Sequence, residues 1–260
     1  MYSGKLWSKE TCLGLMTLAW QGDSQLFIRF PERIDALINE NVIALNNCFE
    51  KHPYIEETVP GYHTLALEIG LEGLMQLEKW LPEFIGLLDD VVSEMDKRNT
   101  TAGGSIDITA LEGRMIKLPI CYNEEFGPDL TYVAEYTGLT ALEVVKRHVS
   151  QHYRVYMLGF SPGFPYLGGM DPSLQTPRLK VPRLKIPPGS VGIADYQTGI
   201  YPQETPGGWQ IIGRCPILLF DIKSESPAKL RAGDTVIFVP IEPEVYRRLE
   251  LDGGRSWQFT

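Results

Sequence analysis

Polar side chains that can bind a small anion gather between residues 159 and 214. An arginine can pair with a carboxylate or phosphate through two parallel hydrogen bonds, and Arg183 and Arg214 are candidates for that role. Ser190, Gln197 and Tyr201 bring hydroxyl and amide groups to the same segment. We expect these five residues to meet in one substrate pocket, with Ser190 and Gln197 as catalytic candidates. Taken alone, each is more often a core or rim residue.

His148 is the third catalytic candidate, because the pKa of histidine lies near neutrality and suits a general acid or base. It stands near the end of a predicted helix. The alternative is a histidine of the core or of a helix end whose hydrogen bonds are satisfied, which is the more common state of a lone histidine.

The twelve residues from Gly159 to Met170, GFSPGFPYLGGM, combine four glycines, two prolines and three aromatic rings. Glycine permits positive φ whereas proline fixes φ, so the mixture shapes a loop rather than loosening it. Residues 159–213 hold ten of the 25 glycines and nine of the 19 prolines, more than turns alone require. We expect Tyr166 and Trp209 to line the pocket; a purely structural turn cluster is the alternative.

A short internal repeat, TPRLKVPRLK, occupies residues 176–185 and carries four cations in an acidic chain. They are Arg178, Lys180, Arg183 and Lys185. The repeat is either a solvated basic loop or an anion site built around an arginine fork.

The common catalytic signatures are absent from the sequence. It contains no G-x-x-x-x-G-K-[ST], H-E-x-x-H, G-x-S-x-G or G-x-G-x-x-G. Its four cysteines form no C-x-x-C pair and have no histidine at zinc-site spacing, so we predict no metal site. They are expected to be small buried or free thiols in a reducing compartment.

The first hundred residues predict strands and helices in alternation. Strand-like runs at 15–19 and 25–30 flank a turn, and apolar residues from Ile34 to Phe49 recur at helical spacing. A second strand pair is expected around Pro60-Gly61. A further helical stripe covers 71–88, with a break or kink expected near Pro82.

The second half predicts two short helices followed by many short strands. The helices are expected at 129–136 and, behind a Thr140-x-x-Glu143 capping box, at 140–149. Strands are expected at 115–122, 153–158, 190–194, 197–201, 209–212, 217–221 and 235–240, and a last helix at 242–251.

These patterns predict an α+β protein of two domains. We expect an N-terminal α+β domain over residues 1–96, a linker over 97–113 that contains Gly-Gly-Ser, and a strand-rich domain over 114–260 that ends in a helix.

Composition limits the partners. Of 260 residues, 43% are hydrophobic and 22% charged, as in ordinary globular proteins, and the formal net charge is −9. That charge argues against a general nucleic-acid partner, which requires clustered Lys and Arg. No run approaches the ~20 apolar residues needed to cross a bilayer. We therefore expect a cytoplasmic protein with no nucleic-acid or membrane partner.

Several linked motifs resemble one known family. They are VYMLGFSPGFPYLGGMDP, TPRLKVPRLKIPPGSVGIA, QTGIYP and PGGWQIIGRCP. Together with weaker matches upstream, over roughly residues 14–243, they are similar to the allophanate hydrolase subunit 1 family, which includes the B subunit of 5-oxoprolinase and a sporulation histidine-kinase inhibitor. The sequence departs from the family pattern at Asp195-Tyr196, where a glycine pair is common, and at Pro188 and Cys215.

The resemblance implies that the strand-rich domain is a cyclophilin-like β-barrel. It also implies a sister partner, the subunit 2 or C-type protein, and a third, A-type subunit, with which the chain opens 5-oxo-L-proline to L-glutamate at the expense of ATP. ATP is then a co-substrate of the complex, and this chain is expected to be inactive alone and not to bind ATP by itself. Two alternatives stay open: a binding protein that inhibits a sensor histidine kinase, and a carboxyltransferase-like protein that acts on urea or another small amide.

Overall fold

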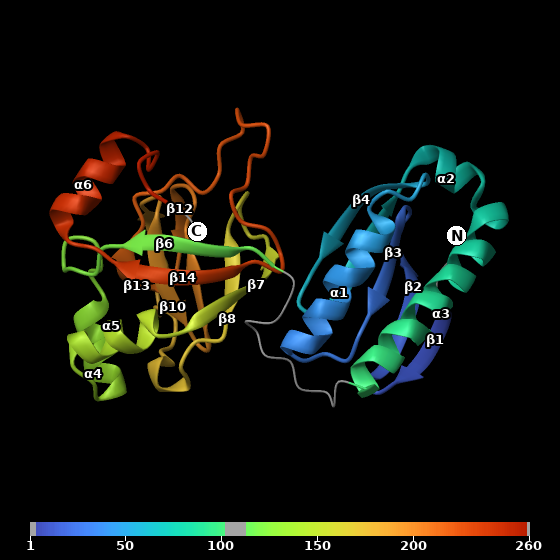
Figure 1. The fold of residues 1–260 in the computed structure, drawn as a ribbon, viewed down its shortest axis with the longest axis horizontal. Helices are drawn as coiled ribbons and strands as arrows, with labels where there is room; N and C mark the ends of the chain where they lie inside the picture. Colours follow the sequence, from blue (N-terminus) through green and yellow to red (C-terminus); the bar gives the residue numbers. More distant parts are fainter. Residues whose placement is uncertain (1–3, 102–112, 259–260) are drawn as a thin grey trace. The chain divides into compact units, whose positions relative to one another are not determined.

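The computed structural model describes residues 4–101 and 113–258 (Figure 1). Contacts between residues divide the chain into two compact units, Met1–Leu111 and Glu112–Thr260. The sequence-predicted linker, residues 97–113, overlaps the end of helix α3, which continues to Thr101. The rest of that segment, 102–112, lies outside the described residues, so the exact boundary stays a prediction.

The N-terminal unit is one antiparallel sheet with its helices packed on a single core. Its elements are β1 (Gly4–Thr11), β2 (Gly14–Gln21), β3 (Gln25–Arg29), α1 (Ala36–Phe49), β4 (Ile55–Pro60), β5 (Thr64–Ile69), α2 (Leu71–Met75) and α3 (Leu77–Thr101). The strand order is β1-β2-β3-β5-β4. Alternate strand residues such as Leu65 and Leu67 are buried against apolar residues of α1 and α3. Helix α1 begins after Asp35, whose carboxylate accepts hydrogen bonds from the N–H groups of Leu37 and Ile38.

The C-terminal unit is a curled seven-stranded sheet. Its elements are β6 (Met115–Ile120), α4 (Leu130–Thr137), α5 (Ala141–Val149), β7 (His152–Leu158), β8 (Pro165–Gly168), β9 (Arg183–Ile186), β10 (Ser190–Ala194), β11 (Gln197–Ile200), β12 (Thr205–Gly207), β13 (Gln210–Arg214), β14 (Thr235–Pro240) and α6 (Pro243–Leu251). The strand order is β13-β10-β11-β8-β7-β14-β6, and β9 pairs with β12 separately.

The two edges of this sheet meet at one end. Cys121, just after β6, and Arg214, at the end of β13, exchange two backbone hydrogen bonds of 2.9 and 3.0 Å. The sheet therefore curls into a partly closed barrel, as expected for a cyclophilin-like fold, and α4 and α5 lie at one end of it (Figure 1). The capping box is present: Thr140 caps α5, and Glu143 bonds back to the Thr140 N–H.

Strand alternation separates two apolar clusters on opposite faces of β10, β11 and β13. Ile193, Ile200 and Ile212 point into the main core, together with residues of α4 and α5. Ala194 and Ile211 face the other way, into a second cluster that contains Phe164 and Trp209. This second cluster holds most of the aromatic residues predicted for the site.

Two sequence predictions about elements are wrong, and several strands were missed. Residues 217–221 form no strand; Ile217 and Leu219 are buried in the core from a loop, which imitates strand alternation. The helical break lies at Gln76, between α2 and α3, while Pro82 sits inside α3. Strands β1, β8, β9 and β12 were not predicted: the last three have only three or four residues, which gives too little periodicity, and β1 consists largely of polar residues.

Candidate functional site

Five rings form an aromatic cluster on the outer face of the curled sheet: Phe160, Phe164, Tyr166, Tyr201 and Trp209. Phe164 lies at its centre, with ring centroids 5.0 Å from Tyr166, 5.3 Å from Tyr201 and 5.4 Å from Trp209, all edge-on. The structure thus brings together the three predicted aromatic site residues. Their close packing depends on Gly199, where an added Cβ would lie 2.9 Å from the Phe164 ring.

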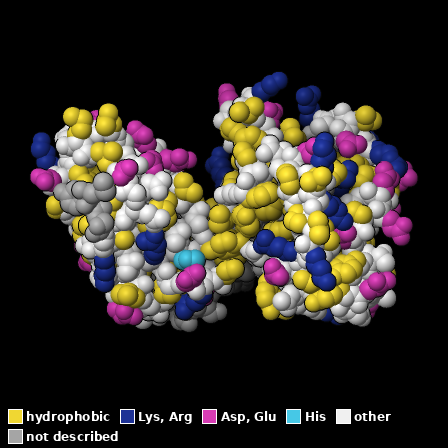
Figure 2. Space-filling view, turned by 180° about the vertical axis from the view of Figure 1, so that it is seen from behind, with side chains coloured by type: hydrophobic (Ala, Val, Ile, Leu, Met, Phe, Trp, Pro, Cys, Tyr) yellow, Lys and Arg dark blue, Asp and Glu magenta, His cyan; other side chains and the backbone are white. Residues whose placement is uncertain are grey.

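The aromatic cluster has an exposed apolar rim. Phe160 is 62% exposed and adopts a positive φ of 66°, a conformation that is rare for a bulky residue and favours a functional explanation. Val181, Leu184 and Tyr196 are also exposed. Figure 2, which views the C-terminal unit from the side opposite to β6 and β14, shows hydrophobic patches between scattered basic side chains. A contiguous exposed apolar patch is a candidate contact surface.

Arg183 is held by an internal ion pair. Its guanidinium donates to Asp129 Oδ1 at 2.6 Å, and the other carboxylate oxygen of Asp129 accepts from the Ile211 N–H at 2.6 Å. The pair joins β9 to the start of α4 and to β13. A substrate anion would have to displace the buried Asp129 carboxylate from Arg183. The role of Arg183 in substrate binding stays a prediction. Sequence reasoning did not single out Asp129, although an acidic residue just before a helix was the available signal.

The other cations of the basic repeat are largely paired as well. Arg178 lies 3.7 Å from Asp195 and stacks over the Trp209 ring at 6.0 Å. Lys185 lies 3.1 Å from Glu204. Both pairs are exposed and contribute little to stability, but they place an acidic group beside two of the four cations of the repeat.

Arg214 and Ser190 lie side by side at the far end of β13 and β10, where they are register partners. The Arg214 guanidinium lies 5.6 Å from the Phe126 ring, and its Nε is buried without a hydrogen-bond partner among the described residues. Ser190 is fully buried, and its hydroxyl donates to the Pro187 carbonyl at 2.7 Å. A local hydrogen bond therefore occupies the Ser190 hydroxyl, whereas Arg214 forms no ion pair within residues 4–101 and 113–258.

The predicted polar residues do not all converge. Gln197 begins β11, next to Ala194 in β10, while Ser190 stands at the opposite end of β10. The five residue steps from Trp209, just before β13, to Arg214 at its end correspond to about 16 Å. Tyr201 packs in the aromatic cluster, and burial raises the pKa of its hydroxyl to about 12. The single pocket that would unite these residues stays a prediction.

His148 lies in the main core, on the face of the sheet away from the aromatic cluster. The Thr198 hydroxyl donates to the Gly192 carbonyl at 2.9 Å, so Thr198 Oγ1 must accept its second bond from His148 Nε2, at 3.0 Å. His148 Nδ1 therefore accepts from the Tyr122 hydroxyl at 2.8 Å. Complete burial lowers the pKa of His148 to about 3, because the charged imidazolium would lose its hydration.

This environment corresponds to the alternative of a satisfied core histidine. A neutral imidazole with both nitrogens bonded and no exposed surface has no route to a substrate at the outer face. The role of His148 as a general acid or base stays a prediction, and it requires the core to open.

Three further properties bear on function. Among residues 4–101 and 113–258, no group of three or more His, Cys, Asp or Glu side chains could hold a metal ion. Within the same residues, no helix has the length and apolar character needed to span a membrane. All four cysteines are free thiols, with Cys121 and Cys215 buried.

Comparison with known proteins gives consistent names. The chain is 40% identical over 238 residues to the B subunit of 5-oxoprolinase from Bacillus subtilis (strain 168). The alignment covers 89% of this chain and 97% of that protein. It is 39% identical to the B subunit of 5-oxoprolinase from Escherichia coli O157:H7, over 72% of this chain and 79% of that protein. It is 46% identical to the protein of the same name from Haemophilus influenzae (strain ATCC 51907 / DSM 11121 / KW20 / Rd), over 52% of this chain and 63% of that protein.

Solved structures share the fold. The crystal structure of TTHA0988 matches 84% of this chain at 32% identity with a TM-score of 0.67, and this chain spans 40% of that longer protein. The Kluyveromyces lactis urea carboxylase matches 98% of this chain with a TM-score of 0.67 but only 18% identity, so that likeness concerns the fold alone. This chain spans 25% of the urea carboxylase.

A family model agrees with both comparisons. The model described as carboxyltransferase domain, subdomain C and D, matches residues 16–230, which include the aromatic cluster, Arg183 and Arg214. The resemblance found in the sequence motifs is thereby confirmed, and the chain belongs to this carboxyltransferase-domain family, whose relatives include the 5-oxoprolinase B subunits.

Proposed function

We propose that this chain is the B subunit of an ATP-dependent 5-oxoprolinase, which acts with a sister C-type protein and a third, A-type subunit to open 5-oxo-L-proline to L-glutamate. The observation that carries the proposal is the 40% identity to the B subunit from Bacillus subtilis over 97% of that protein's length. Two further relatives bear the same name at 39% and 46% identity.

The reaction adds one water across the lactam C–N bond, so that the ring carbonyl becomes a carboxylate and the ring nitrogen an amine. A second water is consumed in the hydrolysis of ATP that drives the opening. Because the sequence contains no P-loop motif, we expect ATP to bind elsewhere in the complex and this chain to be inactive alone.

We assign two roles to the C-terminal unit. The exposed rim of the aromatic cluster, with Phe160, Val181 and Leu184, contacts the sister C-type protein, because exposed apolar surface is stabilised when a partner covers it. Arg214 binds the substrate carboxylate or a phosphoryl group, because its charge forms no ion pair with the described residues. Ser190 is proposed to orient the lactam beside Arg214, which requires the Ser190 hydroxyl to leave the Pro187 carbonyl. The proposed parts of Gln197 and Tyr201 require more, because Gln197 lies at the opposite end of β10 and the Tyr201 ring packs in the aromatic cluster. The four free thiols agree with a cytoplasmic location.

The alternatives are less well supported. None of the three relatives named above is called a kinase inhibitor, and the urea carboxylase likeness, at 18% identity, concerns the fold alone.

Copurification with a tagged C-type protein tests the assembly. We expect the two chains to elute together in size-exclusion chromatography at micromolar concentration, and the pair with the A-type subunit to convert 5-oxoproline but not urea. Replacing Phe160 and Leu184 with Ser should weaken the association, whereas replacing Leu251, which is 90% exposed but lies after the matched family residues, should not. Separate elution of the wild-type chains, or conversion of urea instead, would contradict the proposal.

A further inference from the structure

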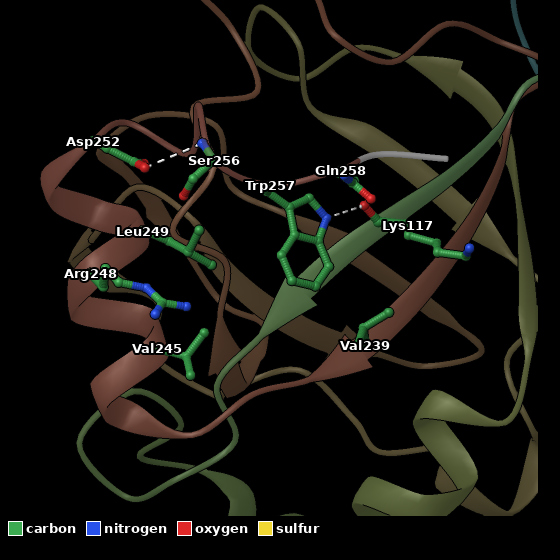
Figure 3. Close-up of a pocket in the computed structure, with 9 residues that line it drawn as sticks. All are labelled: Lys117, Val239, Val245, Arg248, Leu249, Asp252, Ser256, Trp257 and Gln258. Carbon is green, nitrogen blue, oxygen red and sulfur yellow. Dashed lines mark hydrogen bonds between the residues drawn. The ribbon is translucent and has the colours of Figure 1, made fainter.

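A cavity of about 750 Å³ lies between helix α6 and the strands β6 and β14, and it shares no residue with the aromatic cluster. That volume is in the range of sites for small ligands. The lining residues are Lys117, Val239, Val245, Arg248, Leu249, Asp252, Ser256, Trp257 and Gln258 (Figure 3).

One wall of this α6 cavity is an oriented indole ring. Trp257 donates its Nε1–H to the Lys117 carbonyl at 2.9 Å, which fixes the ring across β6. Val245 and Leu249 approach from the helix side, and Val239 from β14 (Figure 3). A fixed indole flanked by aliphatic side chains offers a flat surface on which an aromatic or other flat apolar group can stack.

The same cavity is lined by two cations, Arg248 and Lys117, and by one carboxylate, Asp252. Arg248 points from α6 into the space beside Trp257, and Lys117 stands at the rim (Figure 3). Within residues 4–101 and 113–258, neither forms an ion pair. The adjacent Arg247, in contrast, donates to Glu125 at 2.9 Å. An unpaired guanidinium next to an apolar wall is suited to a carboxylate.

The Asp252 carboxylate adds a hydrogen-bond acceptor to the cavity. Asp252 Oδ2 accepts from the Ser256 N–H at 3.2 Å, and hydrogen bonds from Ser256 and from nearby backbone N–H groups hold the pKa of this carboxyl below its ordinary value. Asp252 Oδ1 has no hydrogen-bond partner of normal geometry among the described residues. The ionised carboxylate can therefore accept a further hydrogen bond at Oδ1, which a ligand N–H would supply.

We propose that the α6 cavity binds a small carboxylate that also has a flat apolar group and an N–H donor, as an N-acylated aromatic amino acid has. Arg248 holds the carboxylate with Lys117 at the rim, the apolar group stacks on Trp257, and Asp252 Oδ1 accepts from the N–H. The site is separate from the proposed lactam chemistry and does not rest on it.

Nuclear magnetic resonance of the indole N–H groups tests the site, with the full chain and N-acetyl-L-phenylalanine as the probe. Trp257→Phe identifies the Trp257 signal. We expect a saturable shift of that signal in the wild type, an affinity lower by ~10-fold in Arg248→Gln, and an unchanged affinity in Arg247→Gln, which removes the same charge from the same helix. Unchanged signals of the remaining tryptophans show that each variant is folded.

Two probe comparisons on the wild-type chain keep the test independent of the variants. N-acetyl-L-phenylalaninamide lacks the carboxylate and 3-phenylpropionate lacks the N–H, and we expect each to bind ~10-fold more weakly than the full probe. The proposal is overturned if no saturable shift appears up to ~10 mM probe, or if the acid and its amide bind equally. Equal weakening in Arg248→Gln and Arg247→Gln overturns the role of Arg248, and equal binding of 3-phenylpropionate overturns that of Asp252.

Discussion

At the scale of single residues, the two arginines that the sequence nominates for one task occupy different environments. Arg183 is paired with Asp129, 54 positions away in the chain, and its side chain is 32% exposed. Arg214 rests on the Phe126 ring with its Nε unpartnered among the described residues. The sequence could nominate both, because residue type and glycine-rich context are local. It could not distinguish them, because the carboxylate that neutralises Arg183 is brought in by the fold.

The variants Arg183→Met and Arg214→Met should therefore have opposite profiles. Arg183→Met leaves the Asp129 carboxylate without its cation and should lower the free energy of unfolding by about 1–3 kcal/mol, as followed by urea denaturation. Arg214→Met should leave stability and partner binding nearly unchanged and lower kcat/KM of the reconstituted complex by ~10- to 100-fold. Adding Asp129→Asn to Arg183→Met should restore part of the stability. Full activity of the Arg214 variant would remove Arg214 from the site.

His148 provides a prediction on pH. Its pKa is about 3 in the folded chain and near the ordinary 6.5 when unfolded, so below pH 6.5 only the unfolded state takes up the proton. Burial of the neutral His148 therefore does not lower the free energy of unfolding above pH 6.5. As pH falls from 6.5 towards 3, the free energy of unfolding decreases by about 1.4 kcal/mol for each pH unit. Histidine NMR should show an Nε2–H tautomer that does not titrate between pH 5 and 8. A midpoint near 6.5 would contradict this environment.

At the scale of elements, sequence patterns succeeded where periodicity is long or capping is explicit. Helices α1 and α5 and strands β7, β10 and β14 were predicted close to their observed bounds. The strand predicted at 217–221 is absent, because a loop that buries every second residue has the same apolar alternation as a strand. The sequence could show that residues 159–170 concentrate aromatic side chains. The place of the aromatic cluster on the outer face depends on sheet register, which no local pattern contains.

Close packing of β11 against the aromatic cluster predicts that Gly199→Ala is harmful. The added methyl would lie within 3.0 Å of the Phe164 ring, the Pro165 carbonyl and the Trp209 ring, so we expect a loss of about 1–3 kcal/mol in unfolding free energy and altered Trp209 fluorescence. The matched control is Gly86→Ala inside α3, where a Cβ meets nothing within 4 Å and the helix should gain about 0.5–1 kcal/mol. Equal effects at the two positions would refute the packing argument.

At the scale of the whole molecule, the chain consists of two compact units with separate cores. Each unit contains a sheet whose strands all come from that unit, and the family match covers parts of both units. The sequence anticipated this division from lost periodicity and a Gly-Gly-Ser stretch, although α3 continues to Thr101, past the expected start of the linker.

Limited proteolysis tests the division. We expect the first cleavage between residues 101 and 113, giving two fragments that resist further digestion, because each unit has its own buried core. First cleavage within residues 159–213 would contradict the division, since the glycines and prolines of that segment are predicted to give it a defined conformation. Mass spectrometry of the fragments locates the cut.

The most direct test of the central claim is an omission assay with the C-type protein and the A-type subunit. Glutamate formation from 5-oxo-L-proline is measured with ATP present, with and without this chain, and with the chain alone. The account predicts ATP-dependent glutamate formation by the complete set, none by the chain alone, and a loss of at least ~100-fold when the chain is left out. Formation at an undiminished rate without the chain, or no formation by the complete assembled set, would contradict its assignment as the B subunit.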